Sequence, residues 1–123
     1  MTRTETDFFV KLQAAVDERY YVFPQMHLSA FLDHKVEGQT WGYAFSHINS
    51  KSVDYVLCDK ATLRPTYAIE LDDYTHERAS RQQRDTEVER ILNEADLPLV
   101  RFQNKDVSEA NIIKALIDSR KLN

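Results

Sequence analysis

The chain has little of several residues that mark specialised protein classes. Its 123 residues include one cysteine, two glycines, three prolines and one tryptophan. The single cysteine, Cys58, cannot form an internal disulfide, and its place in a predicted strand suits a buried, inert thiol. No apolar run approaches the ~18 residues that a membrane-spanning helix requires, and no repeat or low-complexity tract is present. We therefore expect a soluble globular protein without a membrane segment.

An excess of basic charge is also missing. Sixteen lysines and arginines stand against twenty aspartates and glutamates, which gives a formal net charge of −4. This balance argues against a protein that holds nucleic acid through a broad basic face. Arg78, Arg81 and Arg84 form a local basic cluster at helical spacing. They are suited either to phosphate contact or to a solvated helix face paired with nearby acids.

Length and the first residues of the chain set the expected organisation and location. The size suits one domain over residues 1–123, because this length supports one sizeable core and not two. The first twelve residues lack a basic segment followed by a long apolar stretch and a small-residue cleavage site. No secretory signal is visible there, so a cytoplasmic location is expected.

Hydrophobic periodicity predicts seven secondary-structure elements. They are a helix over residues 5–19, strands over 20–26, 52–58 and 67–72, a helix over 81–95, a strand over 97–102 and a final helix. Pro24 marks the first strand as an edge strand or a bulged one. A strand, a helix and a strand in succession indicate a crossover with one parallel pairing. The order αβββαβα therefore predicts an α/β fold with a mixed four-stranded sheet flanked by helices.

Capping residues predict where the two outer helices begin. Thr4 and Asp7 fit a capping box at the first helix, and Asp106 with Glu109 fits one at the last. We expect the last helix to pack through one apolar face. The members of that face are Val107, Ala110, Ile113, Leu116 and Ile117.

The weakest pattern lies in residues 33–50, which contain both glycines. Trp41, Tyr43 and Phe45 alternate there. Alternating aromatics fit a strand that packs inward, or a loop that stacks on bases or meets a partner. His47, just before the next strand, is a secondary candidate for a functional residue.

Three acidic residues fall together on two adjacent predicted strands. Alternation places Asp54 among apolar neighbours on one face of the first strand, and Glu70 and Asp72 on one face of the second. Residues 59–65 are polar and end in proline, which suits a hairpin connection. The hairpin is therefore predicted to bring Asp54 opposite Glu70.

Converging carboxylates repel one another, so such a group needs either shifted protonation or a cation. Hard oxygen ligands suit Mg²⁺ or Mn²⁺ better than zinc, which prefers histidine and cysteine. The alternative is that these acids decorate a solvated sheet edge. Because all three lie on adjacent hydrophobic strands, the sequence predicts a divalent metal site made by Asp54, Glu70 and Asp72.

Five pieces of the sequence together resemble a known family. The pieces are VDYVL at 53–57, IELDD at 69–73, His76, Arg84-Asp85 and LPLVR at 97–101. In combination they resemble a bacterial domain family of unassigned function within the PD-(D/E)XK nuclease superfamily, near the very-short-patch-repair endonucleases. The resemblance covers most of the chain and implies a restriction-endonuclease-like fold.

Carried over residue by residue, the superfamily's first aspartate matches Asp54, and the acid of its E-x-K motif matches Glu70. The lysine of E-x-K is replaced by Asp72, and the glycine of the E-x-D-G relatives by Asp73. Glu5 matches an additional acid of the first helix. The site therefore keeps the acids that the resemblance implies and lacks its usual cation.

The implied activity is phosphodiester hydrolysis of DNA, with Mg²⁺ or Mn²⁺ polarising the phosphate and lowering the pKa of a bound water. His76 or Lys51 is a candidate for the role of the missing lysine. The ordinary histidine pKa of ~6.5 suits proton transfer, and the repair-like relatives carry a histidine at the equivalent place. The other interpretation of His76 is a loop histidine that pairs with neighbouring acids.

Two further functions compete with the nuclease. One is a catalytically inactive module of the same fold that binds nucleic acid or protein, which the missing lysine and the acidic charge favour. The other is a metal phosphoesterase that acts on nucleotides. Because the chain has little basic surface, we expect a nuclease of this kind to bind DNA as a homodimer or together with a second domain or a partner.

Overall fold

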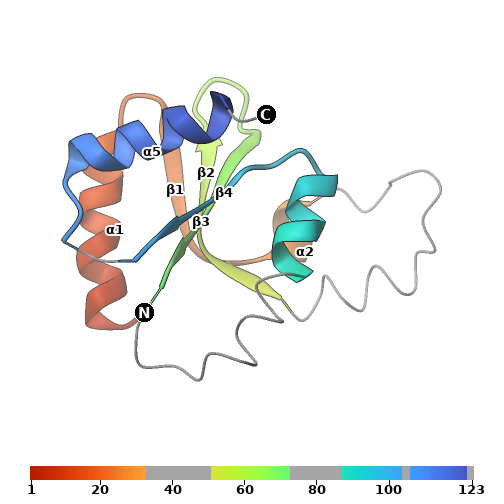
Figure 1. Ribbon diagram of the computed structural model, residues 1–123, viewed down its shortest axis with the longest axis horizontal. Coiled ribbons are helices and arrows are strands. Elements are labelled where there is room, and N and C mark those ends of the chain that lie inside the picture. The colour runs from red at the N-terminus through yellow and green to blue at the C-terminus, as the bar shows by residue number, and fades with distance from the viewer. Residues whose placement is uncertain (33–50, 73–86, 104–105, 122–123) are drawn as a thin grey trace.

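The computed structural model describes residues 1–32, 51–72, 87–103 and 106–121 (Figure 1). Four strands form one sheet in the order β1-β2-β3-β4. Their bounds are β1 Tyr20–His27, β2 Ser52–Asp59, β3 Pro65–Leu71 and β4 Leu99–Phe102. β2 is antiparallel to β1 and β3, whereas β3 and β4 are parallel. The predicted mixed four-stranded sheet with one parallel pair is confirmed.

Helices cover both faces of this sheet (Figure 1). Helices α1 (Arg3–Val16) and α5 (Glu109–Lys121) pack on one face. The short helix α2 (Leu28–Phe31) and a helical segment at residues 87–94 pack on the other. The α/β class predicted from the element order is therefore confirmed.

Alternation along β2 divides the core between these two faces. Tyr55 and Leu57 belong to the cluster under α1 and α5, whereas Val56 and Cys58 belong to the cluster under residues 87–94. Burial raises the pKa of the Cys58 thiol, which keeps it in the less reactive protonated form. The prediction of a buried, inert cysteine agrees with this environment.

β1 is an edge strand of the described sheet, as Pro24 predicted. Its pairing with β2 runs from Tyr20 to Pro24 and resumes at Met26. Between them, Gln25 has a φ of 50°, which lies in the left-handed region. The irregularity therefore sits directly after the proline and beside the strand residue Asp54.

Both predicted helix starts differ from the structure. α1 begins two residues earlier, where Thr2 Oγ1 accepts a hydrogen bond from the Glu5 amide at 3.1 Å and Glu5 Oε1 accepts one from the Thr2 amide at 3.2 Å. α5 begins at Glu109, because Ser108 Oγ accepts from the Asn111 amide at 3.1 Å. Hydroxyl groups therefore cap both helices, in place of the predicted Thr4/Asp7 and Asp106/Glu109 pairs.

The apolar face of α5 is also rotated from the predicted one. Ile112 and Leu116 are buried, whereas Ile113 and Ile117 are exposed. Apolar residues stand at both 112–113 and 116–117, so periodicity alone does not choose between the two stripes. Packing against α1 and β4 makes the choice.

The remaining predicted elements are only partly covered by the described residues. Of the helix predicted over residues 81–95, the part that the structure describes is helical over 87–94. β4 begins two residues later than predicted, at Leu99. Trp41, His47 and the Arg78 cluster lie outside the described residues. In the described part of the chain, every helix is too short or too polar to cross a lipid bilayer.

Candidate functional site

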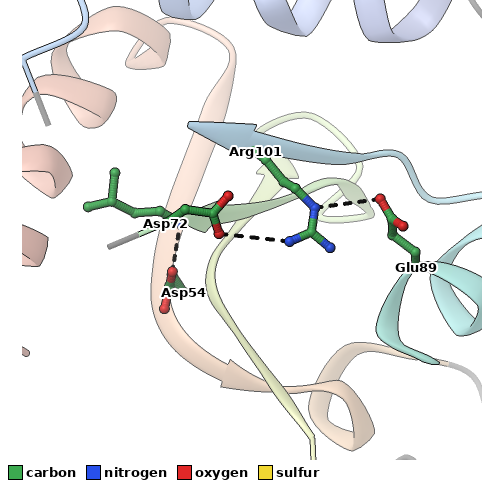
Figure 2. A network of polar contacts seen from close by, with 5 residues as sticks. Asp54, Asp72, Glu89 and Arg101 are labelled. Atoms are coloured by element: carbon green, nitrogen blue, oxygen red, sulfur yellow. Dashed lines mark hydrogen bonds and ion pairs between the residues drawn. The ribbon is translucent and has the colours of Figure 1, made fainter. Parts of the chain in front are cut away.

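Asp54 lies on β2 at the level where β2 and β3 stop pairing. The last β2–β3 pair is Tyr55 with Ile69, so Asp54 and Glu70 come next along the two strands. Asp54 Oδ2 accepts a hydrogen bond from the Leu71 amide at 2.7 Å (Figure 2). The side chain of Asp54 thus takes a backbone donor at the end of β3, and its place beside Glu70 agrees with the predicted hairpin.

Beyond this level the two central strands separate, and we call this region the β2–β3 fork. The first residues of β2 stay paired with β1 as far as Ser52 and His27. The last residues of β3 stay paired with β4 as far as Leu71 and Phe102. Figure 1 shows the two strands diverging below this point. The acids therefore lie where the sheet divides.

Glu70 is the buried charged residue of the described chain, with a side chain only 5% exposed. In the parallel β3–β4 pair it stands level with Arg101. A buried carboxylate is costly unless cations or hydrogen-bond donors surround it. The sequence alternation placed Glu70 on this face, and the structure adds that an arginine on the neighbouring strand occupies the same level.

Arg101 connects Asp72, the residue after β3, to the helical segment at residues 87–94 (Figure 2). Its Nη1 lies 3.8 Å from Asp72 Oδ1, and its Nε lies 3.5 Å from Glu89 Oε1. In Figure 2 the Asp72 carboxylate points toward Arg101, whereas Asp54 accepts its hydrogen bond from the Leu71 amide. Arg101 therefore belongs to the site, although the sequence analysis did not single it out.

Lys51, a predicted catalytic candidate, has a partner outside the three acids. Its Nζ lies 2.9 Å from Glu87 Oε2, and its side chain is only 12% exposed. The pair joins the start of β2 to the start of the helical segment at residues 87–94. In this arrangement Lys51 holds two elements together, and its catalytic role stays a prediction.

Tyr55 lies next to Asp54 in the sequence but points to the opposite face, toward α1. Its hydroxyl donates a hydrogen bond to the carbonyl oxygen of Glu5. Glu5, the proposed match to a first-helix acid, uses its carboxylate to cap α1. Tyr55 thus connects the strand that carries Asp54 to the first turns of α1.

The Tyr55 phenol gives the protein a pH-dependent stability. Burial, followed by the charges of Asp54 and Glu5, raises the pKa of Tyr55 above its ordinary value. The native state therefore keeps this proton longer than the unfolded chain, and the associated stability is lost as pH rises above the ordinary tyrosine pKa of about 10. We expect the free energy of unfolding to fall as pH rises above about 10, and to fall less in Tyr55→Phe.

Urea denaturation at each pH measures this slope. Tyr21→Phe is the matched control, because Tyr21 is exposed on β1 and should leave the wild-type slope in place. Equal slopes in Tyr55→Phe and Tyr21→Phe would contradict the assignment.

The sequence of the whole domain matches one family. The profile of a protein family of unknown function, DUF2726, matches residues 1–120. The chain belongs to this family. Searches of curated proteins and of solved structures found no match. The expected membership in a domain family of unassigned function is thus confirmed, whereas a place in the PD-(D/E)XK superfamily stays a prediction.

The acids of this DUF2726 site fit a divalent metal by their chemistry, but not by their described positions. Asp54, Glu70 and Asp72 supply hard oxygen donors, the type that Mg²⁺ and Mn²⁺ prefer. Within the residues that the structure describes, however, no three histidine, cysteine, aspartate or glutamate side chains group closely enough to hold a metal ion. His76 lies outside those residues. The three-acid metal site therefore stays a prediction.

Proposed function

We propose that this domain is a metal-dependent phosphodiester hydrolase, a nuclease that acts on DNA. The observation that carries the proposal is the pairing of Asp54 with the end of β3, which sets two acids side by side at the β2–β3 fork. One of them, Glu70, is the buried charged residue among those that the structure describes. Ionisable side chains held in such places are candidates for functional groups.

The topology supports the same proposal. The described part of the chain has a helix, three antiparallel strands and a fourth strand parallel to the third, in keeping with the mixed four-stranded sheet expected for a restriction-endonuclease-like fold. Asp54 and Glu70 lie on the two central strands of this sheet. We therefore propose this fold for the domain.

The three acids share one role in the proposed reaction. When bound, Mg²⁺ or Mn²⁺ supplies a polarised phosphate and a water of lowered pKa. Asp54, Glu70 and Asp72 would hold that ion. The Leu71 amide fixes the orientation of Asp54 through the 2.7 Å hydrogen bond, and Glu70 is held by burial. His76 is proposed for proton transfer, with DNA as the substrate.

A second candidate is a catalytically inactive module of the same fold that binds nucleic acid or protein. The contact between Arg101 and Asp72 favours it, because the cation already offsets the charge of one acid. The absence of a grouped set of three ligands in the described residues favours it as well. In both candidates the net charge of −4 calls for a homodimer, a second domain or a partner to hold DNA firmly.

Cleavage of DNA in the presence and absence of divalent ions distinguishes the two candidates. Supercoiled plasmid, linear duplex, single-stranded DNA and RNA are incubated with the protein in Mg²⁺, Mn²⁺ or EDTA. We expect DNA cleavage with Mg²⁺ or Mn²⁺ and none in EDTA. DNA binding without cleavage in any of these ions would favour the inactive module and count against the nuclease.

A further inference from the structure

Helix α5 carries more apolar surface than the core of its own chain covers. Ile112 and Leu116 are buried, whereas their neighbours Ile113 and Ile117 are 42% and 50% exposed. Residues four apart on a helix lie on the same side of it, so Ile113 and Ile117 form one exposed apolar strip. Among the helices that the structure describes, they are the pair of large exposed apolar residues that share one helix face. An exposed apolar surface of this kind, bordered by polar residues, marks an interaction site.

A groove between α1 and α5 extends this apolar surface. Its volume is about 730 Å³, and Ile113 and Ile117 form part of its lining. The small side chains of Ala14 and Ala15 line it from the last turns of α1, which lie beside α5 in Figure 1. The groove therefore has room beside the two isoleucines for side chains of another molecule.

Opposite charges stand at the two ends of the isoleucine pair. Glu109 lies one turn before Ile113, and Arg120 lies three residues after Ile117. The Arg120 guanidinium lies over the ring of Tyr67, 5.4 Å from its centroid. Neither Glu109 nor Arg120 forms an ion pair within the part of the chain that the structure describes. We call Glu109, Ile113, Ile117 and Arg120 the α5 stripe.

We infer that a second copy of this chain packs its α5 stripe against this one, with the two helices antiparallel, and forms a two-fold symmetric dimer. The inference does not rest on the proposed activity. A two-fold interface joins the same patch from both copies, so the patch must complement itself. At a rise of ~1.5 Å per residue, Glu109 lies about 6 Å before Ile113 and Arg120 about 4.5 Å after Ile117. Antiparallel helices therefore place each isoleucine opposite an isoleucine and Glu109 beside Arg120 of the second copy.

The order of charges along the stripe favours this occupant over others. A parallel pair of α5 helices would set glutamate against glutamate and arginine against arginine, which repel each other. A strongly acidic or strongly basic partner would be attracted at one end of the stripe and repelled at the other. The α1 side of the groove also carries both signs, at Glu18 and Arg19. A reversed copy of the same stripe matches the charges at both ends.

Such a dimer does not use the sheet face that carries the acid of β2. Helix α5 packs on the face that holds Tyr55, and alternation places Asp54 on the other face. The contact between the two copies and the β2–β3 fork are therefore on separate sides of each chain.

Sedimentation equilibrium between about 1 and 200 μM protein tests the inference, in the absence of DNA and metal ions. Because one helix stripe is a small interface, we expect a weak dimer with a dissociation constant on the order of 10–100 μM. Ile117→Glu places a charge in the apolar centre and should weaken the dimer at least about tenfold. Val10→Glu is the matched control, because Val10 is exposed on α1 and is not part of the groove lining. It should dimerise within about twofold of wild type.

An exchange of charges tests whether the occupant is an antiparallel second copy. Glu109→Lys and Arg120→Glu each set like charges together at both ends of the stripe, so each variant alone should dimerise about tenfold more weakly than wild type. When the two variants are mixed in equal amounts, every end again has one charge of each sign. The mixture should therefore dimerise about as strongly as wild type. Circular dichroism verifies folding, and should either variant not fold, Ile117→Glu and Val10→Glu carry the test.

Four results would overturn the inference. They are a wild-type protein that stays monomeric over the whole concentration range, equal dimerisation by Ile117→Glu and Val10→Glu, wild-type dimerisation by Glu109→Lys, and a mixture that dimerises no more than its two components. Because the measurement contains no DNA, a monomeric protein rejects the dimer and leaves the nuclease to the cleavage assay. A dimer that cleaves no DNA would retain this inference and reject the nuclease.

Discussion

Asp54→Asn is expected to cleave DNA at least about a hundredfold more slowly than the wild-type protein, a loss comparable to removing one electrostatic group from an active site. Asparagine keeps the size of the side chain and retains an oxygen that can accept the hydrogen bond from the Leu71 amide. The substitution therefore removes the negative charge with little change to the fork. Initial rates of plasmid nicking in Mg²⁺ measure the effect.

Asp118→Asn provides the matched control for that experiment. Asp118 is exposed on α5, against the opposite face of the sheet, and its substitution makes the same change in charge and size. We expect its nicking rate to equal that of wild type. A full rate in Asp54→Asn, or an equal loss in Asp118→Asn, would reject the assignment of Asp54 to the active site.

Phe8→Ala is expected to lower the free energy of unfolding by about 3–5 kcal/mol, the usual range for a fully buried aromatic residue. Phe8 has no exposed surface, and its ring centroid lies 5.5 Å from that of Tyr55 and 5.4 Å from that of Phe102. Its removal leaves a cavity between α1, β2 and β4 that these rings do not fill. Urea denaturation measures the loss.

Val10→Ala is the control on the same helix. Val10 is largely exposed on α1, and truncating it should change the free energy of unfolding by no more than about 0.5 kcal/mol. A loss below about 1 kcal/mol in Phe8→Ala would mean that α1 is not anchored through this aromatic contact.

The sheet could be predicted from the sequence because side chains of different character alternate along its strands. In β2 the residues on either side of Asp54 are apolar and β-branched or aromatic, so the strand and its two faces follow from local pattern. The polar segment ending in Pro65 predicted the hairpin between β2 and β3. The helix predicted before β4 indicated one parallel pair of strands. The neighbourhood of Asp54 and Glu70 followed from these local signals alone.

The features that sequence reasoning missed depend on choices between similar local patterns, or on register. Thr2/Glu5 and Thr4/Asp7 both resemble capping boxes, and the structure uses the pair with glutamate at the third position. Arg101 was overlooked because its level beside Glu70 depends on how β4 slides along β3. A shift of β4 by two residues keeps every side chain on the same face, so alternation alone does not choose between such registers. His76 lies outside the described residues, so its role stays a prediction.

The β2–β3 fork divides the sheet into two ribbons, each with its own backbone ladder. β1 and β2 remain paired to Ser52, and β3 and β4 remain paired to Phe102. Across the fork the contact described is the hydrogen bond between Asp54 and the Leu71 amide. The carboxylate of Asp54 therefore links the two ribbons at the end of the sheet where backbone pairing between β2 and β3 has stopped. At that end a side chain takes the place of the next rung of the β2–β3 ladder.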